Sequence, residues 1–151
     1  GALCKYDHTF SGRNSRLDTI NAAVLNIKLK SYNKVIKRRN ELASIYFKGL
    51  KTIKNVELFK LNKKNTYSFH QFVIRTKKRD QLSSFLKKNK IQTMVHYPYM
   101  LNELKFFNGK NVKKAKDLGK KILSLPISEE HTDNQIKYIV QKINSYFRKI
   151  Y

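Results

Sequence analysis

The chain has 151 residues, 40% of them hydrophobic, and a net charge of +23 from 33 Lys and Arg against 10 Asp and Glu. This length fits one domain or a piece of a larger protein, and the apolar content is sufficient for a packed core. The single cysteine, Cys4, excludes an internal disulfide and is typical of a protein in a reducing cytoplasm. No apolar stretch approaches the roughly 20 residues of a membrane span, so no membrane partner is expected.

The excess of basic residues predicts attraction to polyanions, either a nucleic acid or a phosphorylated small molecule. These residues are dispersed through every segment, and their longest runs are as short as residues 37–39 and 77–79. A compositional drift toward Lys and Asn, spread over solvated faces, explains the same pattern. Charge alone therefore names no partner.

Helical periodicity marks two helices in the first third of the chain. After a polar start that ends at Gly12, apolar residues recur at helical spacing over residues 17–27, so a helix is expected to begin near Ser15. Residues 32–50 form the second expected helix, with apolar positions on one face and mainly charged positions on the other.

Short strands then alternate with helices along the rest of the chain. We expect strands at residues 56–58, 67–75 and 91–95, an extended segment at 123–127, and helices at 79–88 and 112–121. Thr132 and Gln135 fit a capping box at the start of a final helix. This order of elements predicts an α+β fold, in which helices pack on a small sheet.

Two segments carry side chains suited to binding, and the first precedes the first helix. There Gly12 gives the backbone conformational freedom, and Asn14 and Arg16 follow near the start of the helix. Free backbone amides, the helix dipole and a guanidinium at that place can together bind an anion. A simpler interpretation makes Asn14 or Ser15 a helix cap and leaves Arg16 on the surface.

The second segment ends the expected strand at 91–95, where His96 and Tyr97 precede Pro98. A His and a Tyr fixed by a proline suit the wall of a pocket, and an ordinary strand-to-loop turn with a surface His fits the same residues. The four His and one Cys are too scattered for a metal site. The sequence contains neither a P-loop nor a dinucleotide fingerprint.

Taken in order, these motifs resemble the DegT/DnrJ/EryC1/StrS family of sugar aminotransferases. The resemblance begins with Tyr6 and His8 and continues through the run from Gly12 to Leu25, which contains Asn14 and Arg16. Further matches follow in register at residues 38–39, 70–75, 79–82, 91–98, 123–127 and 132–136. The resemblance covers essentially the whole chain.

The resemblance implies that this chain belongs to a larger protein. In this family, a large N-terminal domain holds pyridoxal phosphate on a lysine as a Schiff base, upstream of the matching region. The chain would then be the small C-terminal domain of an aspartate-aminotransferase-like enzyme of fold type I. Residues 1–31 would be a segment and connecting helix returning from the missing large domain, and residues 32–151 the small domain.

Two consequences follow from the missing domain. The Schiff-base lysine is absent from this chain, so the chain by itself is expected to be inactive. The helix at 17–27 is expected to pack on the missing domain and to expose an apolar face in its absence.

The resemblance also implies roles for individual residues. In the family's homodimer, the loop that holds Asn14 and Arg16 reaches the cofactor phosphate of the partner subunit. His96 and Tyr97 look like part of the sugar-nucleotide pocket. Two further candidate substrate contacts are Tyr6 and His8.

The family pattern changes after Pro98. Relatives often continue with another proline and then a histidine, and this chain has Met100 and Asn102 in those places. The departure puts a substrate contact near Asn102 in doubt and indicates a different sugar.

The implied activity of the complete protein is amino transfer, usually from glutamate, to a keto sugar linked to a nucleoside diphosphate. Such a reaction serves amino-sugar or surface-polysaccharide biosynthesis. One alternative is a non-catalytic interaction or regulatory fragment of the same superfamily. The other is a basic nucleic-acid-binding module with aromatic residues among its lysines. We expect no specific nucleic acid, because the aromatic positions fall on apolar faces.

Overall fold

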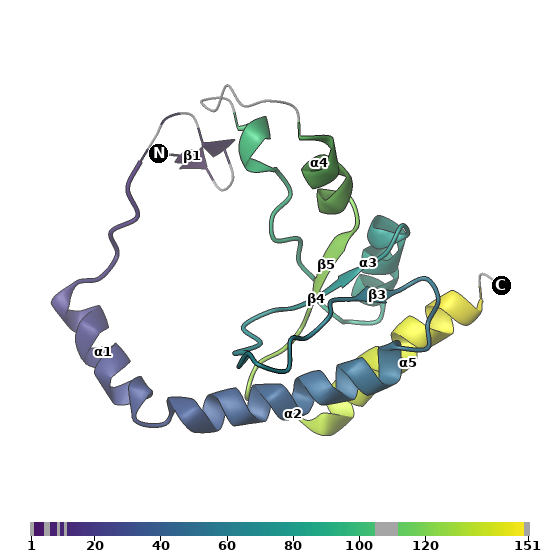
Figure 1. Cartoon of the computed structure of the whole chain (residues 1–151), viewed down its shortest axis with the longest axis horizontal. Helices are drawn as coiled ribbons and strands as arrows, with labels where there is room; N and C mark the ends of the chain where they lie inside the picture. The colour runs from purple at the N-terminus through teal and green to yellow at the C-terminus, as the bar shows by residue number, and fades with distance from the viewer. Residues whose placement is uncertain (1, 5–6, 9, 11, 105–111, 150–151) are drawn as a thin grey trace.

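A computed structural model describes residues 2–4, 7–8, 10, 12–104 and 112–149, with only the backbone described for residues 2–4 and 7–8. Figure 1 shows the elements in chain order: β1 (Ala2–Cys4), β2 (Asp7–His8), α1 (Thr19–Leu29), α2 (Tyr32–Leu50), β3 (Glu57–Leu58), β4 (Phe72–Arg75), α3 (Arg79–Lys88), the 3₁₀ turn η1 (Leu101–Glu103), α4 (Lys113–Gly119), β5 (Ile122–Leu125) and α5 (Asp133–Arg148). No helix in the described part of the chain is both long enough and apolar enough to cross a membrane.

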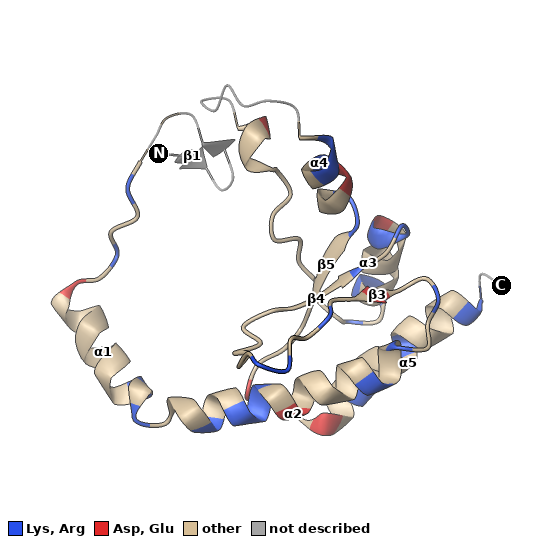
Figure 2. Cartoon of the chain, viewed as in Figure 1, with Lys and Arg blue, Asp and Glu red and all other residues tan. Residues whose placement is uncertain are grey.

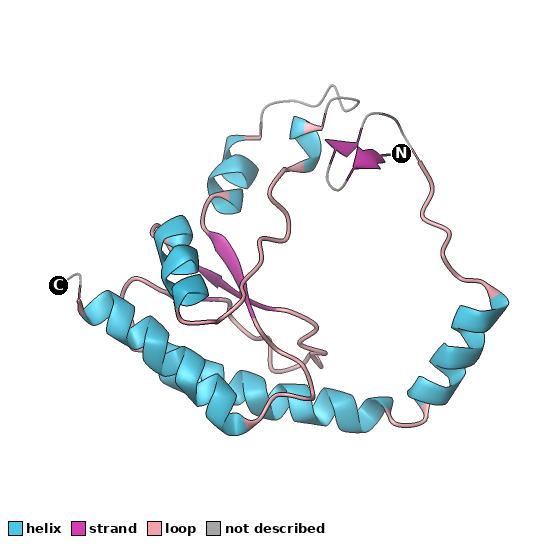
Figure 3. Cartoon of the chain, turned by 180° about the vertical axis from the view of Figure 1, so that it is seen from behind, coloured by secondary structure: helices cyan, strands magenta, loops and turns pink. Residues whose placement is uncertain are grey.

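The centre of the fold is a three-stranded antiparallel sheet in the order β3-β4-β5. Helices α2 and α5 pack against each other along their length, and α3 contacts both α5 and β5. Helices and strands are thus combined as the sequence predicted, and the α+β class is confirmed (Figures 1 and 3).

The core lies on the helix-covered face of the sheet. Along β4, Phe72 and Ile74 are buried while Arg75 is exposed, as expected when alternate side chains point to opposite faces. The ring of Tyr46, on α2, stacks on Phe72 with 4.6 Å between ring centroids. Leu42, from the same helix, is also fully buried. This packing leaves the opposite face of the sheet for other contacts.

Helix α1 stands apart from the sheet, on the far side of the chain from α3 and α4 (Figure 1). None of its residues is buried, and Ile20 is 77% exposed and Ile27 70%. The expected exposed apolar face is therefore confirmed. Its packing on an upstream domain stays a prediction.

The prediction that this first helix begins near Ser15 was wrong. The helix begins at Thr19, because the carboxylate of Asp18 accepts a hydrogen bond of 2.8 Å from the backbone N–H of Asn21 and caps it. The interpretation of Asn14 or Ser15 as the cap is wrong for the same reason.

Two expected strands are shorter than their sequence patterns. Of residues 67–75, only Phe72–Arg75 is a strand, because Phe69 has a positive φ of 44° and interrupts it. Of residues 91–95, only Met94 pairs, in a single bridge to Ser124. The remaining strand boundaries differ from expectation by a residue or two.

Helices α2, α3 and α5 were predicted most closely. Helices α2 and α3 have the expected bounds. The capping box of α5 is confirmed, since Thr132 Oγ1 accepts from the backbone of Gln135 and Gln135 Oε1 accepts from the backbone of Thr132. Helix α4 ends at Gly119, earlier than the expected residue 121, because the chain turns there into β5.

A glycine allows the close approach of α2 and α5. The backbone oxygen of Gly49 accepts a hydrogen bond of 3.3 Å from Asn144 Nδ2 of α5. A Cβ at position 49 would overlap the γ-methyl group Cγ1 of Val140 and lie 3.3 Å from Cγ2. Because Val140 is β-branched and sits in a helix, its side chain has little freedom to turn away.

We predict that Gly49→Ala lowers the free energy of unfolding by about 1–3 kcal/mol through overpacking, despite the higher helix propensity of alanine. Urea denaturation followed by circular dichroism measures the change. Combining it with Val140→Ala should give less destabilisation than the sum of the two single changes. Lys48→Ala, at the exposed neighbouring position, is the control. Stabilisation by Gly49→Ala would contradict the proposed close contact.

Candidate functional site

His96 and Tyr97 lie just beyond the bridge between Met94 and β5. Nδ1 of His96 is 2.9 Å from Oγ of Ser124, so the imidazole is held at β5. The ring of Tyr97 meets that of His96 edge to face, with 5.6 Å between centroids, and Tyr97 is 58% exposed. The structure thus places the two predicted residues together at the sheet.

A cavity of about 950 Å³ opens beside His96. Its wall combines the end of β5 and the residues after it, the residues after α3, and the first turns of α5. Its hydrogen-bonding side chains include several amides, namely Gln71, Asn89, Gln92, Asn134 and Gln135. No Asp or Glu is among its described lining residues, whereas Lys90 is. Apolar side chains, among them Met94, Ile127 and Ile139, also line the cavity, so its wall suits a ligand that combines hydroxyl or charged groups with an apolar part.

Metal binding finds no support in this cavity. Three of the four histidines, His70, His96 and His131, line it. Within residues 12–104 and 112–149 and the other described positions, no three His, Cys, Asp or Glu side chains are grouped as a metal ion requires.

A second cavity, of about 450 Å³, is also lined by His96 and by residues of η1 and α4. Its lining is mainly apolar and includes Tyr97, Met100 and Leu118. Met100 packs directly over Gly119, where an added Cβ would be 2.7 Å from Met100 Cε. Nζ of Lys116, on α4, is 3.7 Å from a carboxylate oxygen of Glu103. Helix α4 therefore supports the loop that follows His96 and Tyr97.

Asn14 and Arg16 lie on an extended, exposed segment that precedes α1. The hypothesis that they sit at a helix N-terminus open to an anion was wrong, because Asp18 occupies that terminus with its carboxylate. Their side chains, one amide and one guanidinium, still supply hydrogen-bond donors suited to a phosphate. Arg16 forms no ion pair with a described carboxylate, so its charge is available to a ligand.

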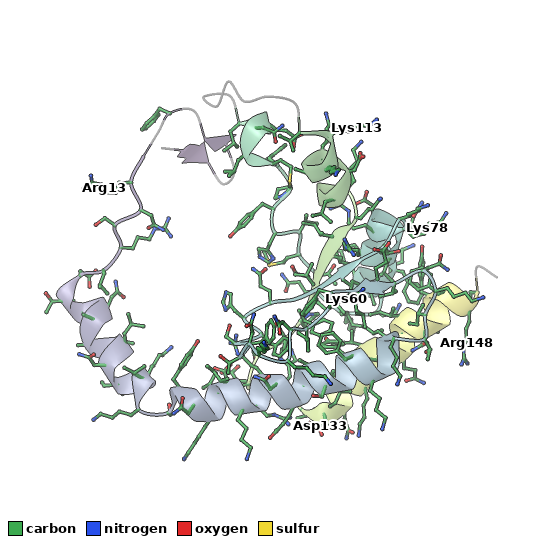
Figure 4. The ribbon with its side chains drawn as sticks, viewed as in Figure 1. Arg13, Lys60, Lys78, Lys113, Asp133 and Arg148 are labelled. Carbon is green, nitrogen blue, oxygen red and sulfur yellow. The ribbon has the colours of Figure 1, made fainter. Side chains whose placement is uncertain are left out.

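The structure does not bring all predicted residues together. Figure 4 shows the extended segment, marked by Arg13, well away from the side chains packed between the sheet and α2. Tyr6 lies outside the described residues. For His8, in β2, only the backbone is described.

Comparison with known proteins identifies the family of this chain. The profile of the DegT/DnrJ/EryC1/StrS aminotransferase family matches residues 2–144. The chain belongs to this family.

Individual family members match nearly all of the chain. It is 32% identical over 151 residues to the dTDP-3-amino-3,6-dideoxy-alpha-D-galactopyranose transaminase of Aneurinibacillus thermoaerophilus, over 97% of the chain and 41% of that protein. It is 34% identical over 155 residues to the pleiotropic regulatory protein of Geobacillus stearothermophilus, over 98% of the chain and 42% of that protein. The crystal structure of S. venezuelae DesV in complex with a ketimine intermediate has a TM-score of 0.82 and 29% identity, over 97% of this chain and 41% of that one. The chain therefore spans about two fifths of the length of these relatives.

The paired arginines of the family match have a structural role here. Arg38 binds Asp133 at 2.8 Å and donates a hydrogen bond of 2.8 Å to the backbone oxygen of His131. Arg39 binds Glu129 at 2.9 Å. Together they fasten α2 to the start of α5, which forms part of the larger cavity wall.

Sequence reasoning missed two residues that support the site, Ser124 and Tyr46. Ser124 lies between two core leucines of β5, so alternation along the strand was the signal that its side chain faces the other way. Tyr46 was assigned only to an apolar helix face. Its hydroxyl donates a hydrogen bond of 2.7 Å to the backbone oxygen of Pro126, which lines the larger cavity.

Burial raises the pKa of the Tyr46 hydroxyl well above its ordinary value near 10. Because the pKa is higher in the folded state, this residue stabilises the fold below the unfolded pKa of about 10, and the contribution is lost as the pH rises above that value. The unfolded chain then ionises a tyrosine that the folded chain keeps neutral.

We predict that Tyr46→Phe lowers the free energy of unfolding by about 1–3 kcal/mol at pH 8, because the Pro126 oxygen loses its described donor. The difference from the wild type should shrink between pH 9 and pH 11, where only the wild type has Tyr46 to ionise on unfolding. Denaturation curves at each pH measure it. A difference that stays constant over this range would count against a neutral, buried hydroxyl.

Proposed function

We propose that the complete protein is a pyridoxal-phosphate-dependent aminotransferase that transfers an amino group, with glutamate as donor, to a nucleotide-linked keto sugar. The family match over residues 2–144 carries the proposal. The transaminase from A. thermoaerophilus, named for a dTDP-linked amino sugar, supports the substrate class. The reaction would serve amino-sugar or surface-polysaccharide biosynthesis in the cytoplasm.

In this proposal the chain is the C-terminal part of a homodimeric enzyme. Residues 1–31 return from a large domain upstream, and residues 32–151 form the small domain. The share of about 41% that the chain covers in its relatives leaves room for such a domain. The exposed apolar face of α1 gives that domain a surface to pack on.

The cofactor, held on a lysine upstream of this chain, supplies the electron sink for amino transfer when it is bound. The residues of this chain bind and orient. His96 and Tyr97 form the wall that meets the sugar nucleotide, and Tyr6 and His8 are further contacts of the same kind. The acid-free cavity beside His96 suits the hydroxyl groups and the diphosphate of such a substrate.

The departure from the family at residue 100 has a packing explanation. Met100 is held against Gly119 of α4, so its side chain supports the loop that carries His96 and Tyr97. Substrate choice in this loop would then depend on Tyr97, on Met100 and on residues beyond it, among them Asn102.

Asn14 and Arg16 are assigned to the phosphate of the cofactor bound by the partner subunit. Their donor types fit a phosphate, and their exposed segment stands apart from the sheet of its own chain (Figure 4). A residue that serves the neighbouring active site can be tested by mixing two inactive variants.

We predict that Arg16→Ala homodimers and homodimers lacking the upstream cofactor lysine are each inactive, and that activity returns when their subunits are mixed. In a mixed dimer, one site combines an intact lysine from one subunit with an intact Arg16 from the other. Random exchange should restore about a quarter of the wild-type sites, since half of the dimers are mixed and each has one intact site. Steady-state transaminase assays after subunit exchange measure this recovery.

The matched control is Arg13→Ala, which removes an exposed arginine from the same segment and should leave activity near the wild-type value. No recovery in the mixture, with mixed dimers shown to form, would mean that Arg16 serves its own subunit.

The nucleic-acid alternative has no support from the fold. Large aromatic residues such as Phe69 and Phe72 are buried against each other in the core and are not available to stack on bases. Figure 2 shows Lys and Arg on the helices and on the loops between them, without a single continuous strip. We propose instead that the net positive charge attracts an anionic sugar nucleotide to the protein.

A further inference from the structure

Three hydrogen bonds meet at Ser124, in the middle of β5. Its backbone N–H donates to the oxygen of Met94 at 2.8 Å, and its backbone oxygen accepts from Met94 at 3.2 Å. Its hydroxyl oxygen is 2.9 Å from Nδ1 of His96. One residue thus fixes both the backbone just before His96 and the imidazole ring itself.

The position of Ser124 in the strand explains why a hydroxyl is needed there. Leu123 and Leu125 on either side belong to the hydrophobic core, and alternation turns Ser124 to the opposite face. Ser124 is only 6% exposed, so its hydroxyl depends on a protein partner for its hydrogen bond. Among the described residues, that partner is His96.

The ring nitrogen that remains is Nε2. No described residue forms a hydrogen bond with it, and His96 borders both the larger and the smaller cavity. A neutral imidazole carries one N–H, and the partner of one nitrogen decides which nitrogen keeps the proton. A serine hydroxyl that donates to Nδ1 leaves the proton on Nε2.

We propose that Ser124 is a positioning residue that holds His96 with a proton on Nε2, so that the ring donates a hydrogen bond to an oxygen of the sugar nucleotide. This inference rests on the proposed function, because it needs His96 at the substrate. It adds Ser124 as a residue that acts through His96, and it makes Nε2 of His96 the hydrogen-bond donor. Sugar and diphosphate oxygens accept hydrogen bonds. With the proton on Nδ1, Nε2 would have no hydrogen to donate to them.

The test uses the complete enzyme and compares Ser124→Ala with Ser124→Thr. We expect Ser124→Ala to raise KM for the sugar nucleotide about fivefold to tenfold, the loss equivalent to one neutral hydrogen bond. KM for the amino donor and kcat should stay within about twofold, because the chemical step is untouched. Ser124→Thr keeps the hydroxyl and should restore most of the wild-type KM.

A matched control removes a similar hydroxyl close by. Oγ of Ser83 is 2.8 Å from Oγ1 of Thr93, just before Met94, whereas the described hydrogen bond of the His96 ring goes to Ser124. Ser83→Ala should therefore leave KM for the sugar nucleotide unchanged. An equal rise in KM in Ser83→Ala would show that any loosening of this region has the same effect, and would overturn the proposal.

A double-mutant cycle separates this inference from the proposed function. In a His96→Ala background, Ser124→Ala should have no further effect on KM, because the ring that Ser124 positions is gone. If His96→Ala alone leaves KM unchanged, the role of His96 in the proposed function fails. If His96→Ala raises KM and Ser124→Ala does not, only the positioning role fails.

The proton on the ring gives a second readout, independent of activity. Nitrogen-15 spectra of the histidine rings distinguish the two neutral forms of imidazole. We expect His96 to carry its proton on Nε2 in the wild type and to become a mixture of both forms in Ser124→Ala. A wild-type ring with its proton on Nδ1 would overturn the proposal.

Discussion

The antiparallel pairing of β4 with β5 is the constraint on which both the core and the candidate site depend. It sets Phe72 opposite Leu125 and Ile74 opposite Leu123, and these side chains fill the face covered by the helices. The same pairing sets Val73 opposite Ser124 and turns Ser124 to the other face. A slip of one residue would place the serine in the core and the leucines at the site.

The two faces of the sheet therefore make different contacts. The helix side is closed by α2 and α5, whose close approach at Gly49 and whose ion pairs at Arg38 and Arg39 fix the cavity wall at the start of α5. The other side carries His96 and the loop supported by α4. The core leucines of β5 face the helix side, and Ser124 and His96 lie on the other, while the first turn of α5 adds Asn134 and Gln135 to the cavity wall.

Much of this fold could be predicted from the sequence, because the signals were local. Helices α2, α3 and α5 followed from apolar spacing and, for α5, from the capping box at Thr132. The start of α1 was misplaced, since Asp18 competes with Asn14 and Ser15 as a capping residue and only the backbone geometry distinguishes them. The strand pattern at 91–95 failed because pairing depends on a distant partner, here Ser124 for Met94 alone.

The candidate site was predictable from the sequence only where its signals were local. His96 and Tyr97 were proposed from their place before Pro98 and from a family pattern, whereas the hydroxyl of Ser124 that contacts His96 comes from a residue 28 positions away. The contact between Ser124 and His96 forms only in the folded chain, so a local sequence pattern does not predict it. The roles proposed for Asn14 and Arg16 involve a second subunit and an upstream domain, so contacts within this chain do not test them.

The central claim is that this chain binds and orients ligands for an active site completed by other parts of a dimer. A crystal structure of the full-length protein with cofactor and sugar nucleotide tests it most directly, through two distances. We predict the Arg16 guanidinium at about 3 Å from the cofactor phosphate bound by the partner subunit, and His96 Nε2 at about 3 Å from a substrate oxygen. Arg16 directed into solvent or toward its own subunit's cofactor, with His96 remote from the substrate, would contradict the account.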